Sequence, residues 1–344
     1  MTDTTDSRAR LEEFFRRRSD DPASVTVTEY EVITGGYSRA MARVWVEDAT
    51  GRRGYVVRSD PPPGQSIIDT DRAQEWAVLS ALHESGMVPL PPPRWFDATG
   101  AELGSPAIVM DLIESESLLS KARREVTDEP DLAMADQLGA TAAGVDTFDV
   151  AVLPADLERP TSWDDYIDQR IQRWVDAERA HVSSDPVMRY VASWLRDNKP
   201  PPMPLGLVHG DFQMANVLVD QNGDYVLIDW ELTHIGDPRE DLGWGVLGLA
   251  LQAPEVVLDD DAFYTRYRER TGFTEEQVNP ATVAYFTVLG ADNVFLSVME
   301  QLAGVATGAT TAMMVAYMSN AVVGMHNEFM KAIDLNEAIR SGAR

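Results

Sequence analysis

The segment LVHGDFQMANVLVDQNGDYVLIDWE, residues 207–231, restricts the fold more than any other part of the chain. Two short apolar runs flank Asn-Gly at 222–223, and this arrangement is the strongest short-range signal for a β-hairpin. Because a hairpin returns its two ends to the same place, we expect Asn216 and Asp229 to lie near each other, with Asp211 in the loop that enters the hairpin. The segment therefore predicts a group of polar side chains at the ends of neighbouring strands.

The chemistry of these side chains favours phosphoryl transfer. An Asn carbonyl and a carboxylate are the hard oxygen ligands that Mg²⁺ accepts together with phosphate oxygens, and a further carboxylate can accept a hydroxyl proton. Taken singly, each residue has an ordinary alternative: His209 is typical of a hydrogen-bonded structural histidine, and Asp211 or Asp229 of a loop cap or an ion pair. The combined spacing with the hairpin is far more specific than any one of them.

Composition excludes several classes of site. The chain has 344 residues, which suits one large domain or two associated lobes, and no cysteine, which excludes disulfides, zinc-thiolate sites and thiol nucleophiles. Its N-terminus MTDTTDSRAR lacks the apolar run of a signal peptide, and no stretch approaches the roughly 18 apolar residues of a membrane span. We therefore expect a cytoplasmic protein without a membrane partner.

The formal net charge of −27 bears on possible partners. Binding to nucleic acid requires clustered Lys and Arg at phosphate contacts, which an acidic protein field opposes, so we expect no nucleic-acid partner. Surplus Asp and Glu most often form a solvated surface. An acidic pocket for a cationic substrate remains an alternative.

The first 113 residues show mainly the period-two pattern of strands. An amphipathic helix carrying Leu11, Phe14 and Phe15 comes first, and a second helix is expected at 71–83. Five strands are predicted at 24–33, 35–48, 55–58, 93–100 and 106–113, with a tight connection at 48–54. This part reads as a small α+β lobe with a five-stranded antiparallel sheet.

The remainder is mostly helical, interrupted by the strands around Leu207 and by the hairpin. Helices are predicted at about 131–144, 163–180, 186–198, 242–251, 260–271, 282–302 and 310–338. The fold class is thus α+β, with a small antiparallel lobe and a larger helical lobe.

The motifs HGDFQMANVLVD and YVLIDWELTHIGDPREDLGW resemble those of the aminoglycoside phosphotransferase family, whose fold is similar to that of protein kinases. The resemblance covers nearly the whole chain. It implies that Asp211 is the catalytic base, that His209 orients its loop, and that Asn216 and Asp229 hold Mg²⁺. It also implies that Asp241 braces the catalytic loop.

The resemblance extends to nucleotide-binding residues near the N-terminus. Gly35 and Gly36, helped by Ser38, occupy a turn whose N–H groups would approach ATP phosphates, although a Gly-Gly turn alone is typical of an ordinary hairpin. Glu75 stands where the family's helix pairs with a strand-three cation. That cation is Arg58 here instead of the usual lysine, a pattern similar to the kinase-like domains attached to acyl-CoA dehydrogenases.

Two further elements are implied by the resemblance. The backbone of Asp111 and Ile113 in the linker IVMDLIE is expected to read adenine, the alternative being a plain interlobe strand. The helix at 161–180 matches an insertion that helps form the acceptor site, although its aromatic residues are more typical of core packing.

We therefore predict an ATP- and Mg²⁺-dependent O-phosphotransferase acting on a small hydroxylated molecule. Residues 1–113 would bind nucleotide, and residues 114–344 would carry the catalytic loop, the metal site and the acceptor site. The rivals are a pseudo-kinase that binds nucleotide or metabolite without turnover, suggested by Arg58, and a metal-dependent phosphohydrolase. The sequence does not choose among aminoglycosides, sugars, choline-like amines and hydroxyacyl-CoA as acceptors, between ATP and GTP, or among oligomeric states.

Overall fold

The computed structural model describes residues 4–33, 40–60, 71–180, 186–292, 295–296 and 312–343. The chain divides into two compact units. The first contains Met1–Ser115 and Val219–Glu231, and the second contains Glu116–Leu218 and Leu232–Arg344. The functional division into residues 1–113 and 114–344 stays a prediction.

The first unit is built on the predicted five-stranded antiparallel sheet, which is confirmed with the strand order β1-β2-β3-β5-β4. Its strands are β1 (Thr26–Ile33), β2 (Ala40–Asp48), β3 (Gly51–Ser59), β4 (Pro93–Asp97) and β5 (Ala107–Asp111). The tight connection predicted at 48–54 is shorter than expected. Gly51 already pairs with Asp48, so β3 begins four residues before the predicted strand at 55–58.

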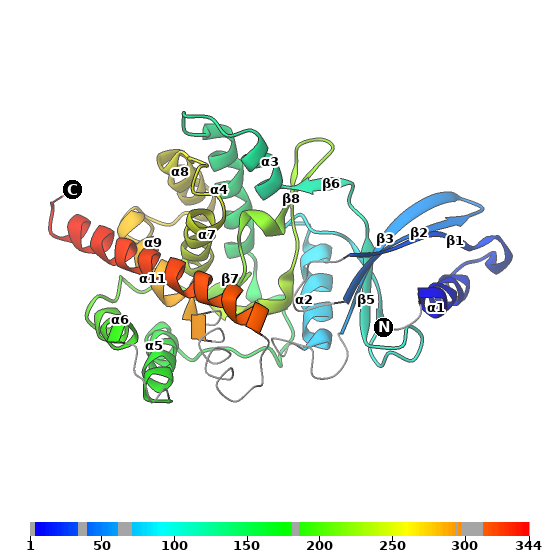
Figure 1. Cartoon of the computed structure of the whole chain (residues 1–344), viewed down its shortest axis with the longest axis horizontal. Coiled ribbons are helices and arrows are strands. Elements are labelled where there is room, and N and C mark those ends of the chain that lie inside the picture. Colours follow the sequence, from blue (N-terminus) through cyan, green and yellow to red (C-terminus); the bar gives the residue numbers. More distant parts are fainter. Residues whose placement is uncertain are drawn as a thin grey trace. The chain divides into compact units, whose positions relative to one another are not determined.

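Two helices accompany this sheet (Figure 1). Helix α1 (Thr4–Arg16) buries the predicted apolar residues Leu11, Phe14 and Phe15 in one core cluster with strand residues such as Val44. Helix α2 (Arg72–Ser85) packs beside β4 and β5. The Asp71 side chain caps α2 by accepting the N–H groups of its first turn, which fixes where the helix begins.

The second unit is largely helical (Figure 1). Its helices are α3 (Leu118–Arg124), α4 (Leu132–Asp146), α5 (Trp163–Ala180), α6 (Pro186–Asp197), α7 (Arg239–Gln252), α8 (Asp260–Thr271), α9 (Pro280–Leu289) and α11 (Ala312–Arg340). Within this unit α4 packs on α8, α5 on α6, and α9 on both α7 and α11. Short α3 was not predicted, and part of the helix predicted at 282–302 lies outside the described residues.

Short strands lie on either side of the loop that carries His209, Gly210 and Asp211. Strands β7 (Gly206–Val208) and β10 (His234–Gly236) form an antiparallel pair, with Val208 opposite His234. A three-stranded sheet has the order β6-β8-β9, in which β6 is Ser115–Ser117, β8 is Val217–Asp220 and β9 is Tyr225–Leu227. The hairpin is confirmed, with Asp220 bonded to Asp224 across a three-residue connection in which Gly223 has a φ of 87°.

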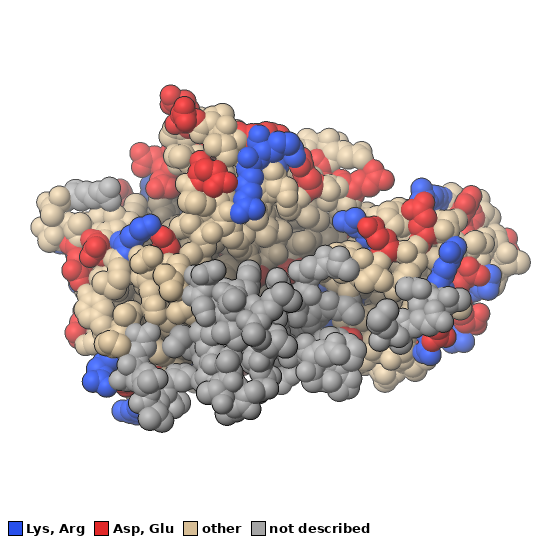
Figure 2. Space-filling view, viewed as in Figure 1, with Lys and Arg blue, Asp and Glu red and all other residues tan. Residues whose placement is uncertain are grey.

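No helix in the described part of the chain combines the length and hydrophobicity needed to cross a membrane. On the face drawn in Figure 2, acidic and basic side chains are interspersed over both units.

Candidate active site

A buried carboxylate fixes the loop that follows β7. Asp241, in the first turn of α7, accepts the backbone N–H of His209 at 2.7 Å and that of Gly210 at 2.9 Å. The expected brace is therefore confirmed. Burial raises the pKa of Asp241 to about 7, against the lowering effect of the two N–H bonds.

The loop turns tightly at Gly210. Its φ is 83°, a left-handed conformation that glycine adopts without strain. A Cβ atom at this position would lie 2.4 Å from the carbonyl oxygen of Leu232, so no larger residue fits without moving that backbone. The glycine thus allows the chain to turn sharply just before Asp211.

Neutral donors hold the Asp211 carboxylate. Its Oδ1 accepts Gln213 Nε2 and Trp244 Nε1, each at 2.6 Å, and its Oδ2 accepts Asn216 Nδ2 at 2.6 Å. The Asp211 N–H donates to Nδ1 of the fully buried His209 at 3.2 Å. Hydrogen bonds from neutral donors orient a carboxylate and favour its ionised form without cancelling its charge. The ring contact of His209 fits an orienting role, which stays a prediction.

The orientation of the Asn216 amide decides which of its atoms is available to a ligand. Its Nδ2 donates both to Oδ2 of Asp211 and to the backbone oxygen of Asp211, at 2.6 and 2.9 Å. Because both acceptors require the nitrogen to face Asp211, the carbonyl Oδ1 points elsewhere. That oxygen is the atom a hard cation would bind.

Three carboxylates surround Arg58 in the first unit. Its guanidinium donates to Glu75 at 2.9 Å, to Asp229 at 2.6 Å and to Glu231 at 3.3 Å. Arg58 and Glu75 are 5% and 4% exposed, so these are buried charges and not surface pairs. The expected pairing of Arg58 with Glu75 is confirmed, whereas its role in nucleotide binding stays a prediction.

A second arginine extends this cluster. Arg72 donates to Glu75 at 2.5 Å and to Asp60 at 2.7 Å, so Glu75 lies between two guanidinium groups. Burial alone would lower the pKa of Arg58, but Asp229, Glu75 and Glu231 together raise it above its ordinary value. Arg58 therefore stays charged, and its burial is balanced by the acids that surround it.

Asp229 has an unusual backbone. Its φ of 70° is the only positive φ among the described residues other than glycine. Asp tolerates the left-handed region better than most residues, and such conformations occur more often at functional sites. The side chain is 34% exposed, so a ligand can reach it although Arg58 is bonded to its Oδ1.

The other predicted nucleotide-binding residues differ in what the structure shows. Gly35, Gly36 and Ser38 lie outside the described residues. The Asp111 N–H donates to the carbonyl of Pro92 at 3.0 Å, and the carbonyl of Ile113 accepts the Ser115 hydroxyl at 3.0 Å. The recognition of adenine by Asp111 or Ile113 stays a prediction. The Asp111 N–H and the Ile113 carbonyl already have hydrogen-bond partners within the protein.

The aromatic residues of α5 belong to the core, as expected. Trp163, Tyr166 and Trp174 are all buried. Tyr166 and Arg170 bond to Glu240 of α7, and Arg170 also binds Asp292 at 2.7 Å. This ionic cluster links α5 to α7, the helix whose Asp241 fixes the loop before Asp211, and a role of α5 in acceptor binding stays a prediction.

Four contacting residues were not predicted. Gln213 and Trp244 stand inside the quoted motifs, but side chains outside the base and metal positions were not considered there. Arg72 lies three residues before Glu75 on one helix, a spacing that places side chains on one face. Glu231 follows Asp229 by two residues and was the remaining acidic side chain of the IDWE stretch.

The fold and this set of contacts define the class of protein as kinase-like. Residues 29–280 match the model of the phosphotransferase enzyme family (APH), and the chain belongs to that family. It is accordingly a phosphotransferase by family. Within the described residues, no three His, Asp or Glu side chains gather closely enough to hold a metal ion by themselves.

Two curated relatives are larger proteins. The chain is 27% identical to the probable acyl-CoA dehydrogenase IBR3 of Arabidopsis thaliana over 64% of its own length and 28% of the relative's. It is also 27% identical to acyl-CoA dehydrogenase family member 10 of Mus musculus, over 57% of its length and 18% of the relative's. The chain therefore spans less than a third of either relative, as the resemblance to attached kinase-like domains implied.

Solved structures share the fold at low identity. A candidate aminoglycoside phosphotransferase of Ralstonia eutropha has a TM-score of 0.71 at 19% identity, covering 94% of this chain and 97% of its own. The aminoglycoside phosphotransferase APH(4)-Ia, solved with ADP and hygromycin B, has a TM-score of 0.62 at 15% identity, covering 94% and 98%. These matches confirm the predicted kinase-like α+β fold.

Proposed function

We propose that the protein is an ATP- and Mg²⁺-dependent O-phosphotransferase that phosphorylates a hydroxyl group of a small molecule. The observation that carries this proposal is the Asp211 carboxylate, held by three neutral donors on a loop that Asp241 fixes. In this role Asp211 accepts the proton of the acceptor hydroxyl. The hydroxyl oxygen then bonds to the γ-phosphorus of ATP as the bond to the bridging oxygen breaks, which leaves ADP and a phosphate ester.

The donor set suits Mg²⁺. Asn216 turns its carbonyl oxygen away from Asp211, and Asp229 is a partly exposed carboxylate, so both offer the oxygen ligands that this ion accepts beside phosphate. When bound, Mg²⁺ supplies charge neutralisation at the phosphates. The bond from Arg58 to Oδ1 of Asp229 holds that carboxylate in place.

Nucleotide use is supported by the fold and by the charge near Asp229. A relative with this fold was solved with ADP, and the family is one of phosphotransferases. Arg58 is a buried, permanently charged group on the strand where kinases place a lysine. A forked guanidinium can contact both a carboxylate and a phosphate, so we infer that Arg58 replaces that lysine.

A panel of hydroxylated acceptors tests the proposal. The protein is incubated with Mg-ATP and with aminoglycosides, sugars, choline-like amines or hydroxyacyl-CoA, and ADP release is measured against the acceptor-free reaction. We expect ADP release that depends on one acceptor class and requires Mg²⁺. Phosphate release that needs no ATP would instead identify a phosphohydrolase.

The second candidate is a pseudo-kinase that binds nucleotide without turnover. The observation in its favour is that Arg58 already occupies one oxygen of Asp229, a predicted metal ligand. Nucleotide binding without acceptor-dependent ADP release from any member of the panel would support this candidate and contradict the first.

A further inference from the structure

We infer that the acceptor is a neutral alcohol with a hydrocarbon body, and that this body binds in an apolar cavity of the second unit beside the catalytic loop. This inference rests on the proposed function, which it narrows to one chemical class of acceptor.

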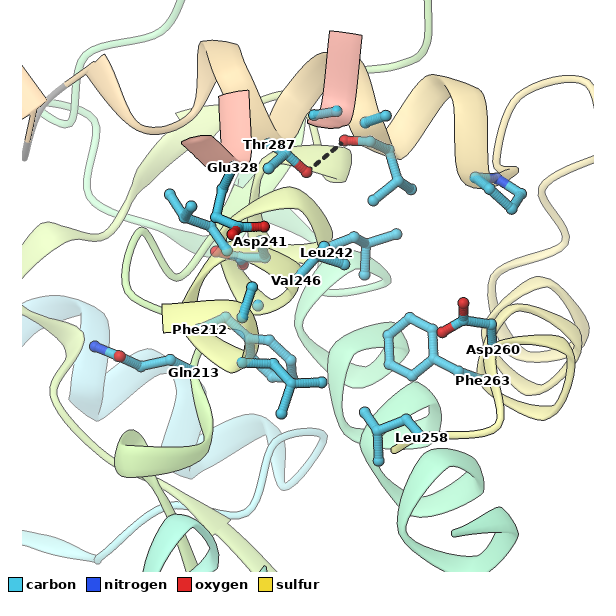
Figure 3. Close-up of a pocket in the computed structure, with 18 of the residues that line it drawn as sticks. Phe212, Gln213, Asp241, Leu242, Val246, Leu258, Asp260, Phe263, Thr287 and Glu328 are labelled. Atoms are coloured by element: carbon cyan, nitrogen blue, oxygen red, sulfur yellow. Dashed lines mark hydrogen bonds between the residues drawn. The ribbon is translucent and has the colours of Figure 1, made fainter. Parts of the chain in front are cut away.

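The cavity has a volume of about 240 Å³ and lies among helices α4, α7, α8, α9 and α11 (Figure 3). Phe212 of the catalytic loop and Phe263 of α8 stand on opposite sides of it (Figure 3). Most lining side chains are hydrocarbon, among them Leu138, Met214, Val246, Leu249, Val283 and Leu335. An apolar wall of this kind gains free energy by removing hydrocarbon from water.

The cavity is joined to the proposed base by a lining residue. Gln213 lines the cavity and also donates to Asp211 at 2.6 Å. Its own carbonyl oxygen accepts a bond from Gln252 at the end of α7, which fixes the amide in this orientation. The residues on either side of Gln213, Phe212 and Met214, line the cavity as well. Asp211 itself does not line the cavity, so the hydroxyl must reach Asp211 past Gln213 while the hydrocarbon part stays inside the cavity.

The charged residues around the cavity do not make it a cation site. Both oxygens of Asp241 accept backbone N–H groups of the catalytic loop. Glu328 is paired with Lys331 at 2.7 Å. Asp260 lies at an exposed position at the start of α8, and partial burial raises the pKa of its carboxyl, with further raising by Asp261 and Asp259. The apolar lining of the cavity therefore favours a neutral ligand.

The size of the cavity limits the ligand. Its 240 Å³ lies below the roughly 300–1,000 Å³ of sites that enclose drug-sized molecules. It can hold a short hydrocarbon chain or a single ring, but a sugar of several rings would exceed it. An alcohol with a slender apolar body therefore fits the cavity best.

Binding of simple alcohols tests the class without any nucleotide. We expect 1-butanol, 1-hexanol and 1-octanol to bind with rising affinity in ligand-observed NMR titrations, about fourfold tighter for each added CH₂ group. 1-Octylamine, positively charged at neutral pH, should bind at least tenfold more weakly than 1-octanol. Equal or tighter binding of the amine would overturn the neutral class, and affinity independent of chain length would overturn the apolar cavity.

Two matched substitutions locate the site. Val246 lines the cavity and is 46% exposed, so Val246→Trp fills the space without disturbing the core. Val152, 60% exposed and not among the lining residues, gives the control Val152→Trp. We expect Val246→Trp to weaken 1-octanol binding at least tenfold and Val152→Trp to leave it unchanged. Should Val246→Trp fail to fold, Ala250→Leu places a smaller group on the same wall.

Failure of this inference and failure of the proposed function give different results. The acceptor panel is therefore extended with 1-hexanol and 1-octanol. If no acceptor in this extended panel is phosphorylated, the proposed function fails, and the acceptor role of the cavity fails with it. If an acceptor is phosphorylated but its KM is the same for wild type and Val246→Trp, the proposed function stands and the cavity assignment is overturned. A KM raised at least tenfold in Val246→Trp, with Val152→Trp normal, supports both.

Discussion

The side chains that hydrogen-bond to Asp211 and to Arg58 differ in kind. Asp211 accepts bonds from Gln213, Asn216 and Trp244, all neutral. Arg58 donates to Glu75, Asp229 and Glu231, all acidic. Neutral donors fix the direction of a carboxylate and leave its charge available for chemistry, whereas acidic partners balance a buried cation.

The kind of partner determines what the Asp211 loop and the Arg58 cluster can each do. A base must accept a proton, so its partners must not neutralise it. A buried arginine needs counter-charges, and it can exchange one of them for a phosphate when a nucleotide binds. The catalytic loop therefore suits proton transfer, and the Arg58 cluster suits the recognition of anions.

The largest expected effect comes from removing the charge of the base. Asp211→Asn keeps the shape of the side chain, but it removes the proton acceptor and places an NH₂ group opposite neutral donors. We expect turnover to fall by about 10²–10⁴-fold in a coupled ADP-release assay. Asp224→Asn, at an exposed position of the hairpin, is the matched control and should keep full activity.

Removal of the buried Arg58 guanidinium is expected to have the next largest effect. Arg58→Ala leaves Glu75, Asp229 and Glu231 without this partner. We expect a loss of about 3–5 kcal/mol in the free energy of unfolding, measured by urea titration, together with weaker Mg-ATP binding. Arg58→Lys should recover part of both, because a point charge replaces a forked one.

A control for this test lies in the same sheet. Arg94 pairs with Asp111 at 2.5 Å, but its side chain is 47% exposed. Arg94→Ala should therefore cost less than about 1 kcal/mol. A cost for Arg58→Ala as small as that for Arg94→Ala would show that burial of the cluster contributes nothing.

The second unit also contains a buried ionic cluster, and the stability that this cluster contributes is expected to depend on pH. Burial opposes ionisation of Glu240, but Arg170 and His234 prevail and lower its pKa from 4.5 to about 2. Because the folded pKa lies below the unfolded one, this stabilisation is complete above about pH 4.5 and is lost as the pH falls toward 2. We expect Glu240→Gln to cost about 3 kcal/mol at pH 7.

The cost of Glu240→Gln should shrink in urea titrations as the pH is lowered from 5 to about 3. The residual activity per folded molecule should stay near that of wild type, since this cluster is structural. A cost that did not change with pH would contradict the assigned ion pairing.

The smallest expected effect separates the two predicted metal ligands. Asp229→Ala removes a charged oxygen ligand and Asn216→Ala a neutral one, so the first should weaken Mg-dependent nucleotide binding about tenfold more than the second. The measurement is a calorimetric titration with Mg-ATP. Equal and negligible effects of the two substitutions would count against both assignments.

Much of the fold follows from local patterns in the sequence. Alternating strands, the Asn-Gly turn at 222–223 and the apolar faces of the helices predicted the five-stranded sheet, the β8–β9 hairpin and most helices. The early start of β3 was missed because GRRG at 51–54 lacks the apolar residues that mark a strand, and pairing with β2 determines it instead.

Site residues could be proposed from the sequence where their spacing along the chain carries the information. Asp211, Asn216 and Asp229 are separated by fixed intervals, and Asp241 follows in a recognisable motif. The contacts of Arg72, Glu231 and Trp244 depend on which way side chains point in three dimensions. The cavity beside Phe212 is formed by helices far apart in the sequence, so no local pattern could reveal it.

The proposed division of labour is that Asp211 accepts the proton of the acceptor while the Arg58 cluster binds the nucleotide. Turnover and the Kd for Mg-ATP are measured side by side for wild type, Asp211→Asn and Arg58→Ala, with the acceptor that the panel identifies. The account predicts that Asp211→Asn loses nearly all turnover with its Kd within a few fold of wild type, and that Arg58→Ala has a clearly raised Kd. Near wild-type turnover in Asp211→Asn, or an unchanged Kd in Arg58→Ala, would contradict it.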